Sequence, residues 1–279
     1  METIVLTGFE GFIGNAIYQN LKNDYNIITL SKKNGYNLNK KIDIKTNLKI
    51  KYFIHAAYLF SNKKILEDEL MNTNLSGIKN ALLFCEKHSS TLIFLSSYIY
   101  GRAKYLPIDI NHPINPHNLY AKSKVECEKK IFEFKQKNSL NFIILRLFNI
   151  YGFKQKKGNL IPDIISQINN KTIKLTHFNS CRDFLYIEDF LKIFKKILNN
   201  KFNKNQVLNV GSGQSVSIRK ILKIIKKIKN NITYIETSPN HVDAVPDCYA
   251  DISLLSKHYK WKPEFSIEDG IKKIIRMHE

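Results

Sequence analysis

Over its first 147 residues, the chain alternates short apolar runs with longer segments in which apolar side chains recur at helical spacing. The apolar, β-branched runs predict buried strands at residues 2–7, 26–30, 52–57, 91–96 and 141–147. Helical spacing predicts helices between them, at residues 12–22, 61–88 and 117–136. Because strands that alternate with helices form parallel βαβ units, the pattern predicts an α/β protein with a doubly wound parallel sheet.

The remainder of the chain, to residue 279, is less regular. Its pattern predicts helices and short strands at residues 162–169, 171–175, 188–198, 207–210, 218–228, 232–235 and 267–275. We expect residues 1–152 to form a Rossmann-type domain that binds a dinucleotide. Later segments, at about residues 181–212, are expected to belong to the same domain. Residues 153–279 are expected to form mainly a smaller C-terminal lobe, closing over the edge of the sheet where ligands of such folds bind.

Residues 7–14 read Thr-Gly-Phe-Glu-Gly-Phe-Ile-Gly, a G-x-x-G-x-x-G pattern between the first predicted strand and the first predicted helix. Gly8 permits a sharp exit from the strand, Gly11 lets the backbone approach a pyrophosphate, and Gly14 lets the helix pack closely. A glycine pattern alone is weak evidence, but this one has the strand and helix that the motif requires. We predict a dinucleotide site here, which also includes Phe9, Phe12 and Ile13.

The end of the second predicted strand bears on the choice of dinucleotide. A site that prefers NAD usually has an acidic residue here, which holds the ribose 2′-hydroxyl. This chain has Ser31, Lys32 and Lys33 and no carboxylate. A hydroxyl followed by two ammonium groups suits a 2′-phosphate, so NADP(H) is favoured. NAD(H) remains the alternative, since paired lysines also arise by chance in a lysine-rich chain.

Tyr120 and Lys124 are four residues apart at the start of a predicted helix, and therefore share one helical face. A neighbouring ammonium lowers the pKa of a phenol, which makes the phenol usable as an acid or base. The fourth predicted strand delivers Ser96 or Ser97 at its carboxyl end, where the hydroxyl could hold a substrate oxygen. Taken alone, the Tyr-Lys pair also fits an ordinary surface tyrosine and lysine.

The formal net charge is +20, but only five of the 44 basic residues are arginine, and the lysines are spread along the whole chain. Nucleic-acid binders usually concentrate basic residues on one face, so nucleic acid is not expected as the main ligand. No apolar run approaches the roughly 18 residues of a membrane helix, and the N-terminal apolar stretch is too short for a signal peptide. The four dispersed cysteines predict reduced thiols and no metal site. We expect a cytoplasmic protein.

Together these features resemble the extended short-chain dehydrogenase/reductase family, which contains nucleotide-sugar epimerases, dehydratases and reductases. The resemblance covers nearly the whole chain, and its motifs occur in the family's order. The matching segments are residues 7–14, 54–57, 72–77, 95–101, 120–124, 146–152, 182–189, 209–211, 249–253 and 261–263. Family analogy also implies a homodimer.

The resemblance implies that Tyr120 is the acid/base, and that Lys124 lowers its pKa and holds the nicotinamide ribose. Ser96, four residues before the tyrosine of the Tyr-Gly pair, takes the place of the catalytic serine or threonine. Arg182 would grip the substrate diphosphate with its forked donors, and a local salt bridge with Asp183 is the alternative. Further dinucleotide contacts are implied at Asp43, Ile44, Ala56, Ala57 and Asn74, and further substrate contacts at Ser97, Asn149, Asn159 and Leu160.

The residues after Ser96 bear on the reaction. Family dehydratases carry an Asp-Glu pair directly after the catalytic threonine, whereas this chain has Ser97 and Tyr98. With no carboxylic acid to protonate a leaving hydroxyl, dehydration is not expected. The missing acid after the second strand and the compact length favour an NADPH-dependent reductase of a nucleotide-linked 4-keto-sugar. A 4-epimerase, which would keep NAD bound and return the hydride to the other sugar face, is the alternative.

The chain also departs from the family pattern. The usual arginine before the late Ala-Asp-Ile-Ser segment is missing, and residues 238–243 stand in its place. Recognition of the diphosphate or base is therefore expected to differ, with His241 and Lys262 as candidates to substitute. A protein of another class, a cofactor sensor or RNA-binding protein of the same fold, remains an alternative. The presence of the serine, tyrosine and lysine together argues against it.

Overall fold

The computed structural model describes residues 1–59, 66–200, 205–237 and 243–278. The chain forms two compact units, each assembled from separate stretches of sequence. The first unit comprises Met1–Ile99, Ile114–Leu147 and Lys195–Leu208. The second comprises Tyr100–Pro113, Phe148–Phe194 and Asn209–Glu279.

A six-stranded sheet in the order β10-β5-β4-β3-β1-β2 organises the first unit. Its pairs β1–β2, β1–β3, β3–β4 and β4–β5 are all parallel. The carboxyl ends of these five strands therefore meet at one edge. The six strands of the sheet are β1 (Thr3–Thr7), β2 (Asn26–Leu30), β3 (Ile50–His55), β4 (Thr91–Ser97), β5 (Asn141–Leu147) and β10 (Gln206–Val210).

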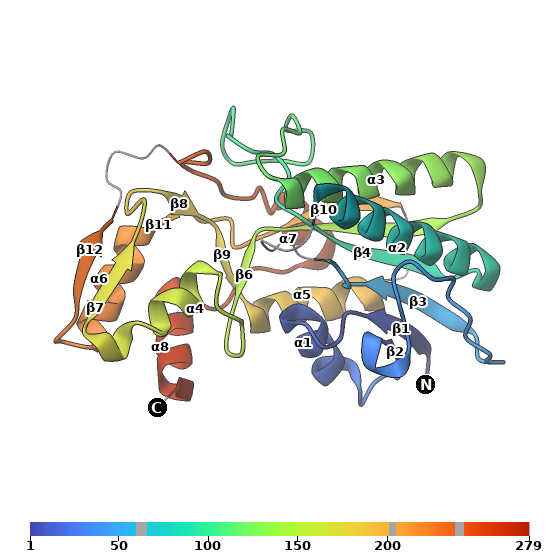
Figure 1. The fold of residues 1–279 in the computed structure, drawn as a ribbon, viewed down its shortest axis with the longest axis horizontal. Helices are drawn as coiled ribbons and strands as arrows, with labels where there is room; N and C mark the ends of the chain where they lie inside the picture. The colour runs from blue at the N-terminus through green and yellow to red at the C-terminus, as the bar shows by residue number, and fades with distance from the viewer. Residues whose placement is uncertain (60–65, 201–204, 238–242, 279) are drawn as a thin grey trace. The chain divides into compact units, whose positions relative to one another are not determined.

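Helices cover both faces of this sheet, as the apolar strand interiors require. In Figure 1, α2 and α3 lie along one face, and α1 and the end of α5 lie along the other. Buried side chains such as Phe53, Phe94 and Ile131 join the sheet to α2 and α3 in one apolar cluster. The helices are α1 (Phe12–Leu21), α2 (Glu67–His88), α3 (Leu119–Lys137) and α5 (Ile187–Asn199).

The predicted α/β fold with a doubly wound, mostly parallel sheet is confirmed. Each of the five strands predicted in the first 147 residues is present, within two residues of its predicted bounds. The helix predicted over residues 61–88 is described from Glu67, and residues 61–65 lie outside the described part of the chain. The third strand ends at His55 rather than at residue 57, and beyond it the Ala57 amide donates to the Thr7 hydroxyl.

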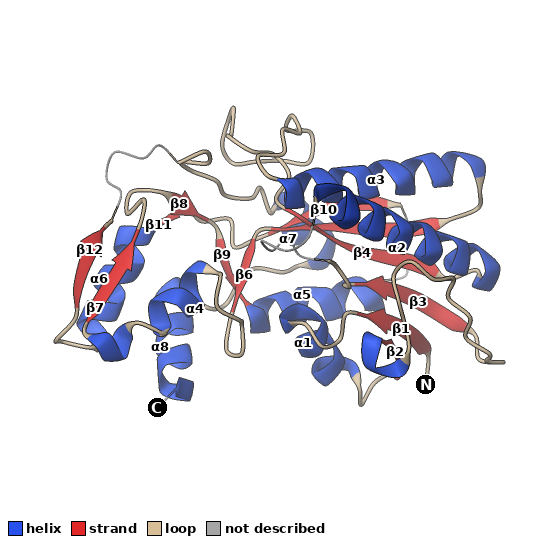
Figure 2. Ribbon diagram, viewed as in Figure 1, coloured by secondary structure: helices blue, strands red, loops and turns tan. Residues whose placement is uncertain are grey.

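The second unit contains short strands in pairs, with helices beside them (Figure 2). The pairs are β6 (Asn149–Tyr151) with β9 (Phe184–Tyr186), β8 (Cys181–Arg182) with β11 (Val216–Ser217), and β7 (Thr172–Leu175) with β12 (Thr233–Glu236). Four of these strands were not predicted, since two or three residues are too few to show a period. The helices are α4 (Leu160–Ile165), α6 (Ile218–Ile228), α7 (Ser253–Tyr259) and α8 (Ile267–His278). The seven-residue helix α7, of about two turns, was not predicted either.

Two single turns of 3₁₀ helix, η1 (Lys32–Asn34) and η2 (Ile168–Asn170), complete the secondary structure of the described residues. The helix predicted over 162–169 is thereby divided into α4 and η2. No helix in the described part of the chain is long and apolar enough to cross a membrane. Within those same residues, no three His, Cys, Asp or Glu side chains gather where they could hold a metal ion.

Candidate active site

The glycine turn connects β1 to α1, and the backbone there leaves little room for larger residues. Gly8 has a φ of +71°, and a Cβ on it would lie 2.6 Å from the backbone nitrogen of Ala57. A Cβ on Gly14 would overlap the carbonyl oxygen of Gly8. The Gly11 amide donates to the same carbonyl at 3.0 Å, which closes the turn. Close backbone approach therefore requires glycine at positions 8 and 14.

The start of α1 fits the dinucleotide that the sequence predicts. Gly11 is the N-cap residue and offers no side-chain acceptor, and the first turn of the helix has no acidic residue. Helix amides without such acceptors, at the positive end of the helix dipole, suit a pyrophosphate. Phe9, Phe12 and Ile13 are partly exposed beside this turn, while their contacts with a dinucleotide stay a prediction.

The end of β3 is tied to the end of β1 at the same edge of the sheet. The Thr7 hydroxyl oxygen accepts from the Ala57 amide at 3.0 Å and lies 3.2 Å from His55 Nδ1. Burial lowers the pKa of His55 to about 3, with a further lowering from Lys124. His55 is therefore neutral at physiological pH. Ala56 and Ala57 are partly exposed, which leaves them available to a ligand.

Asn74, on α2, supports the loop that follows β3. Its Oδ1 accepts from the Leu59 amide at 2.8 Å, and its Nδ2 donates to the Leu59 carbonyl at 3.2 Å. The side chain is buried. The structure thus shows Asn74 holding a loop, and the dinucleotide contact expected of it stays a prediction.

The residues after β2 present positive charge near the glycine turn. Lys32 and Lys33 are exposed in η1, whereas Ser31 is buried. The Lys33 ammonium lies 3.4 Å from the carboxylate of Glu10, which belongs to the glycine turn. Asp43, expected to reach an adenine, is exposed, and the adjacent residue Ile44 packs against the apolar core.

Tyr120 and Lys124 occupy the first two turns of α3, as predicted. The helix is capped by Asn118, whose Oδ1 accepts from the Ala121 amide at 2.8 Å. Lys124 Nζ lies 5.8 Å from the centre of the Tyr120 ring, so the two side chains share a face of the helix. The ring of Tyr58, from the loop after β3, meets Tyr120 edge-on at 4.7 Å between centroids.

Burial has the largest effect on the Tyr120 phenol, and the lowering of its pKa by Lys124 stays a prediction. Burial raises the pKa of Tyr120, and a hydrogen bond with Ser97 opposes this rise. The buried Lys124 ammonium instead donates to the Leu95 carbonyl at 2.7 Å. Burial lowers the pKa of Lys124 to about 8, and interactions with Cys127 and Glu128 oppose this lowering. The ammonium is thus held by a strand carbonyl rather than by the phenol.

Ser96 and Ser97 exchange the roles expected from the sequence. Ser96 is 2 % exposed and donates to Glu128 Oε1 at 2.5 Å, so its hydroxyl faces the protein interior. Ser97 is partly exposed and hydrogen-bonds the Tyr120 phenol. The assignment of Ser96 as the catalytic hydroxyl is therefore corrected: Ser97, expected among the substrate contacts, is the serine beside the phenol. Counting back from the Tyr-Gly pair selected Ser96, one residue before the serine that meets the phenol.

In the second unit, Arg182 is held by residues of its own surroundings. Its Nη2 lies 2.6 Å from Asp243 Oδ2, and its Nη1 donates to the carbonyls of Cys181 and Val245. The alternative of a salt bridge with Asp183 is wrong. Asp183 is fully buried and accepts from backbone amides of Ser212, Gly213 and Ala250. Desolvation opposes the Asp243 charge, but hydrogen bonds and Arg182 hold the pKa of that carboxyl below its usual value.

The other expected substrate residues lie in the same unit. Asn149, on β6, is exposed and donates to the Asp183 carbonyl at 3.0 Å. Asn159 is the exposed N-cap residue of α4, and Leu160 begins that helix. Lys262 is exposed, and His241 lies outside the described residues. Their substrate contacts stay predictions.

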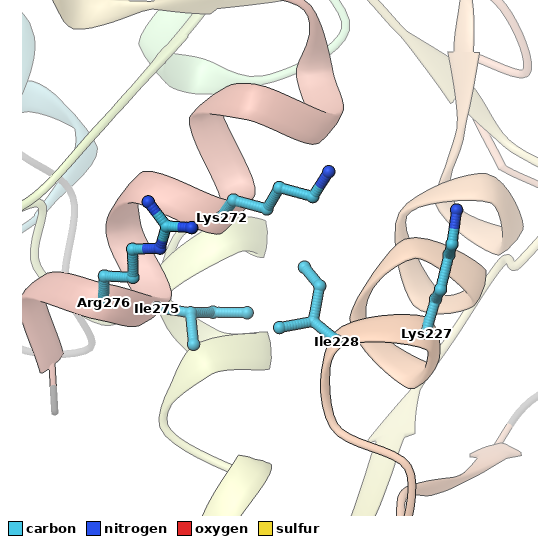
Figure 3. Close-up of a pocket in the computed structure, with 5 residues that line it drawn as sticks. All are labelled: Lys227, Ile228, Lys272, Ile275 and Arg276. Carbon is cyan, nitrogen blue, oxygen red and sulfur yellow. The ribbon is translucent and has the colours of Figure 1, made fainter.

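A cavity of about 330 Å³ at the ends of α6 and α8 contains none of the predicted site residues (Figure 3). It is lined by Lys227, Ile228, Lys272, Ile275 and Arg276. Its polar lining residues are two lysines and one arginine, and the described residues that line it include no phenol or hydroxyl that could exchange a proton with a keto-sugar. Lys272 pairs with Glu268 at 2.6 Å. The chemistry-bearing residues instead lie at the carboxyl ends of β1, β3 and β4 and in the first turns of α3.

Three side chains of this region were not predicted as functional. Tyr58 lies against Tyr120 and Lys124, and Glu128 forms a buried ion pair with Arg146 at 2.7 Å. The position of Glu128, four residues after Lys124 on the same helical face, was the available sequence signal. For Tyr58 the sequence carries no signal beyond its place after the Ala-Ala pair.

Comparison with known proteins agrees with this geometry. Residues 4–211 match the model of the NAD dependent epimerase/dehydratase family. A Methanocaldococcus jannaschii protein, provisionally named UDP-glucose 4-epimerase, is 30% identical over 98% of this chain and 97% of its own. The dTDP-4-dehydro-6-deoxyglucose reductase of Escherichia coli is 29% identical over 81% of this chain and 74% of its own.

Solved structures share the fold over nearly the whole chain. RMD from Pseudomonas aeruginosa, complexed with NADPH, has a TM-score of 0.87 at 22% identity, covering 99% of this chain and 98% of that one. WbmG of Bordetella bronchiseptica, in complex with NAD and UDP, has a TM-score of 0.81 at 21% identity, covering 99% and 93%. The glycine turn, the Tyr-Lys helix and the family match together show that the chain belongs to the NAD dependent epimerase/dehydratase family, among the extended short-chain dehydrogenase/reductases.

Proposed function

We propose that this protein reduces a nucleotide-linked 4-keto-sugar with NADPH. The observation that carries the proposal is the arrangement of Ser97, Tyr120 and Lys124 at the carboxyl edge of the sheet whose β1 leads into the glycine turn. In parallel α/β sheets this edge is where ligands bind. The reductase of Escherichia coli that resembles this chain supports the same reaction class.

A bound NADPH would supply the hydride for the carbonyl carbon of the substrate. Tyr120 would give its phenolic proton to the carbonyl oxygen, while the Ser97 hydroxyl donates a hydrogen bond to that oxygen. The ketone, NADPH and one proton become an alcohol and NADP⁺. Burial suits Tyr120 to this role, because a raised pKa keeps the phenol protonated until an oxyanion develops beside it. Lys124 donates one N–H to the Leu95 carbonyl and would hold the nicotinamide ribose with its remaining donors.

The preference for NADPH is supported by charge at the end of β2. Lys32 and Lys33 follow the strand directly, and the Lys33 ammonium lies beside Glu10 of the glycine turn. The residues that follow β2 directly include no carboxylate to hold a 2′-hydroxyl. A 2′-phosphate would form charge-assisted contacts with both ammonium groups.

Substrate recognition is proposed for the second unit. Arg182, Asn149, Asn159 and Leu160 would contact the nucleotide diphosphate and sugar. Arg182 is prepared for this by Asp243, which fixes one end of its guanidinium in place. An arginine held in this way retains further N–H donors for a phosphate.

A 4-epimerase is the second candidate, favoured by the relative from Methanocaldococcus jannaschii. In that reaction the same Tyr120 would first take and then return the proton, and the dinucleotide would stay bound. Dehydration remains unsupported after the correction at Ser97, because Tyr98 and Ile99 follow it and neither is a carboxylic acid.

The decisive experiment measures NADPH and NADH oxidation with a panel of nucleotide-linked 4-keto-sugars. We expect NADPH oxidation with at least one of them. Tyr120→Phe should lower turnover by at least about 100-fold, since it removes the proton donor, and should leave dinucleotide binding nearly intact. Interconversion of 4-epimers without added dinucleotide would instead establish the epimerase. Wild-type turnover in Tyr120→Phe would refute both candidates.

A further inference from the structure

Three consecutive residues at the end of β4 are each tied to a different residue of α3. The Leu95 carbonyl accepts from Lys124 Nζ at 2.7 Å, and Ser96 Oγ donates to Glu128 Oε1 at 2.5 Å. Ser97 hydrogen-bonds Tyr120. The three helix positions are spaced by four residues and therefore lie on one face. We call these contacts the β4–α3 ladder.

The Glu128 contact of this ladder is fixed by a second strand. Arg146, on β5, approaches Glu128 with Nε at 3.2 Å from both carboxylate oxygens and with Nη2 at 2.7 Å from Oε2. Both side chains are almost completely buried, at 3% exposure for Glu128 and 5% for Arg146. Ser96 and Arg146 face each other across the parallel pair β4–β5. Glu128 thus joins two strands and one helix at a single point.

From this geometry we propose that Glu128 is a positioning residue, which through Ser96 and Arg146 holds α3 in register with β4 so that Tyr120 meets Ser97. The proposal rests on the function proposed above for Tyr120 and Ser97. A shift of α3 by one residue would move all three contacts together, because they lie on one helical face. The almost completely buried pair of Glu128 and Arg146 restricts movement of α3 most strongly, because an unpaired charge in the interior is costly.

Glu128 also contributes to the electrostatic surroundings of Lys124. The groups around that ammonium are His55 and Tyr58 from β3 and its loop, Tyr120, Cys127 and Glu128 from α3, and, through Glu128, Arg146 from β5. His55 stays neutral above about pH 3, and burial raises the pKa of Tyr58 to about 12 and that of Cys127 to about 11. Glu128 is the carboxyl group of this set, and it pairs with Arg146 at 2.7 Å.

Removal of the Glu128 charge should change the pH dependence of turnover. The Glu128 charge raises the pKa of Lys124, which burial has lowered to about 8. Removing that charge lowers the pKa further, so the ammonium is lost at a lower pH. The alkaline limb of the turnover profile should then move to lower pH. A residue that only stabilised the fold would leave this limb in place.

The test uses the full chain and three variants, with Lys124→Met as a fourth for the NMR assignment. Glu128→Gln removes the charge, and Ser96→Ala removes the hydrogen bond from Ser96 to Glu128 without changing the charge. Glu133→Gln is the matched control, because Glu133 lies on the same helix in an exposed pair with Lys130 at 2.8 Å. Turnover and dinucleotide KM are measured from pH 6 to 10, and Lys124 is titrated by NMR of lysine-labelled protein, assigned with Lys124→Met.

We expect Glu128→Gln to lower kcat at least tenfold with the dinucleotide KM within twofold. It should also move the Lys124 titration and the alkaline limb down by about one pH unit. Ser96→Ala should lower kcat several-fold with the Lys124 titration unchanged, and Glu133→Gln should match the wild type. A folded Glu128→Gln protein with wild-type kcat and Lys124 titration would overturn the proposal.

Two further results keep this test separate from the proposed function. If the wild type turns over no keto-sugar, the proposed reaction fails, while the Lys124 titration and amide exchange at Ser97 still decide whether the ladder exists. If Glu128→Gln does not fold, Ser96→Ala decides. Unchanged kcat and unchanged amide exchange at Ser97 in Ser96→Ala would then refute the positioning role.

Discussion

At the scale of single residues, two adjacent serines of β4 contact different side chains. Ser96 is buried against Glu128, and Ser97 reaches the Tyr120 phenol. Lys124 likewise contacts the Leu95 carbonyl, which its spacing from Tyr120 did not indicate. The chemistry of each side chain follows from its type, but its partner is set by the direction in which the backbone points it.

The cofactor preference is a prediction at this scale. Replacing Lys32 and Lys33 by alanine should weaken NADPH binding at least tenfold and NADH binding less than twofold, because only NADPH carries the 2′-phosphate. The measurement is calorimetric titration with each dinucleotide. Lys79→Ala with Lys87→Ala, two exposed lysines of α2, is the charge-matched control. Equal losses for NADPH and NADH would contradict the preference.

At the scale of elements, strongly periodic segments were predicted correctly and very short ones were missed. The five strands of the parallel sheet carry enough apolar residues to be recognised, whereas β8 and β11 have two residues each. Those short strands exist because their partners offer backbone hydrogen bonds, as when Val216 pairs with Arg182. No local pattern encodes such a pairing.

The glycine turn allows a prediction about one element. Gly8→Ala should destabilise the protein more than Gly35→Ala and should abolish dinucleotide binding. Both glycines have positive φ, but a Cβ on Gly35 would meet nothing within 4 Å, whereas one on Gly8 would clash with Ala57. Backbone strain alone costs about 1 kcal/mol, so the excess loss in Gly8→Ala measures the crowding. Urea unfolding and dinucleotide titration of the two variants make the comparison, and equal effects would show that the turn tolerates a side chain.

At the scale of the whole molecule, the chain is divided between two units and carries a net charge of +20. The unit that contains Tyr120 and the glycine turn is built from three separate stretches of sequence, as is the unit that contains Arg182. The excess charge comes from lysines spread along the chain. Such a general positive field attracts polyanions without selecting among them.

This charge leads to a prediction for the entire protein. Binding to a nucleic-acid column should be weak and should be lost once the salt concentration reaches about 150 mM, because scattered lysines give contacts that salt screens readily. Turnover with NADPH should persist at that salt concentration. Firm retention at physiological salt, together with no turnover of any keto-sugar, would instead favour a nucleic-acid-binding protein of this fold.

The amino-acid sequence by itself determined the alternation of strands and helices, the glycine turn after β1, and the shared face of Tyr120 and Lys124. These depend on residues within about ten positions of one another, where local backbone geometry decides the outcome. Only the tertiary structure decided that Ser97 rather than Ser96 meets the phenol, and that Arg182 pairs with Asp243. Ser96 and Glu128 are 32 positions apart, and Arg182 and Asp243 are 61 apart. Such contacts form only when packing brings distant segments together, so no local pattern encodes them.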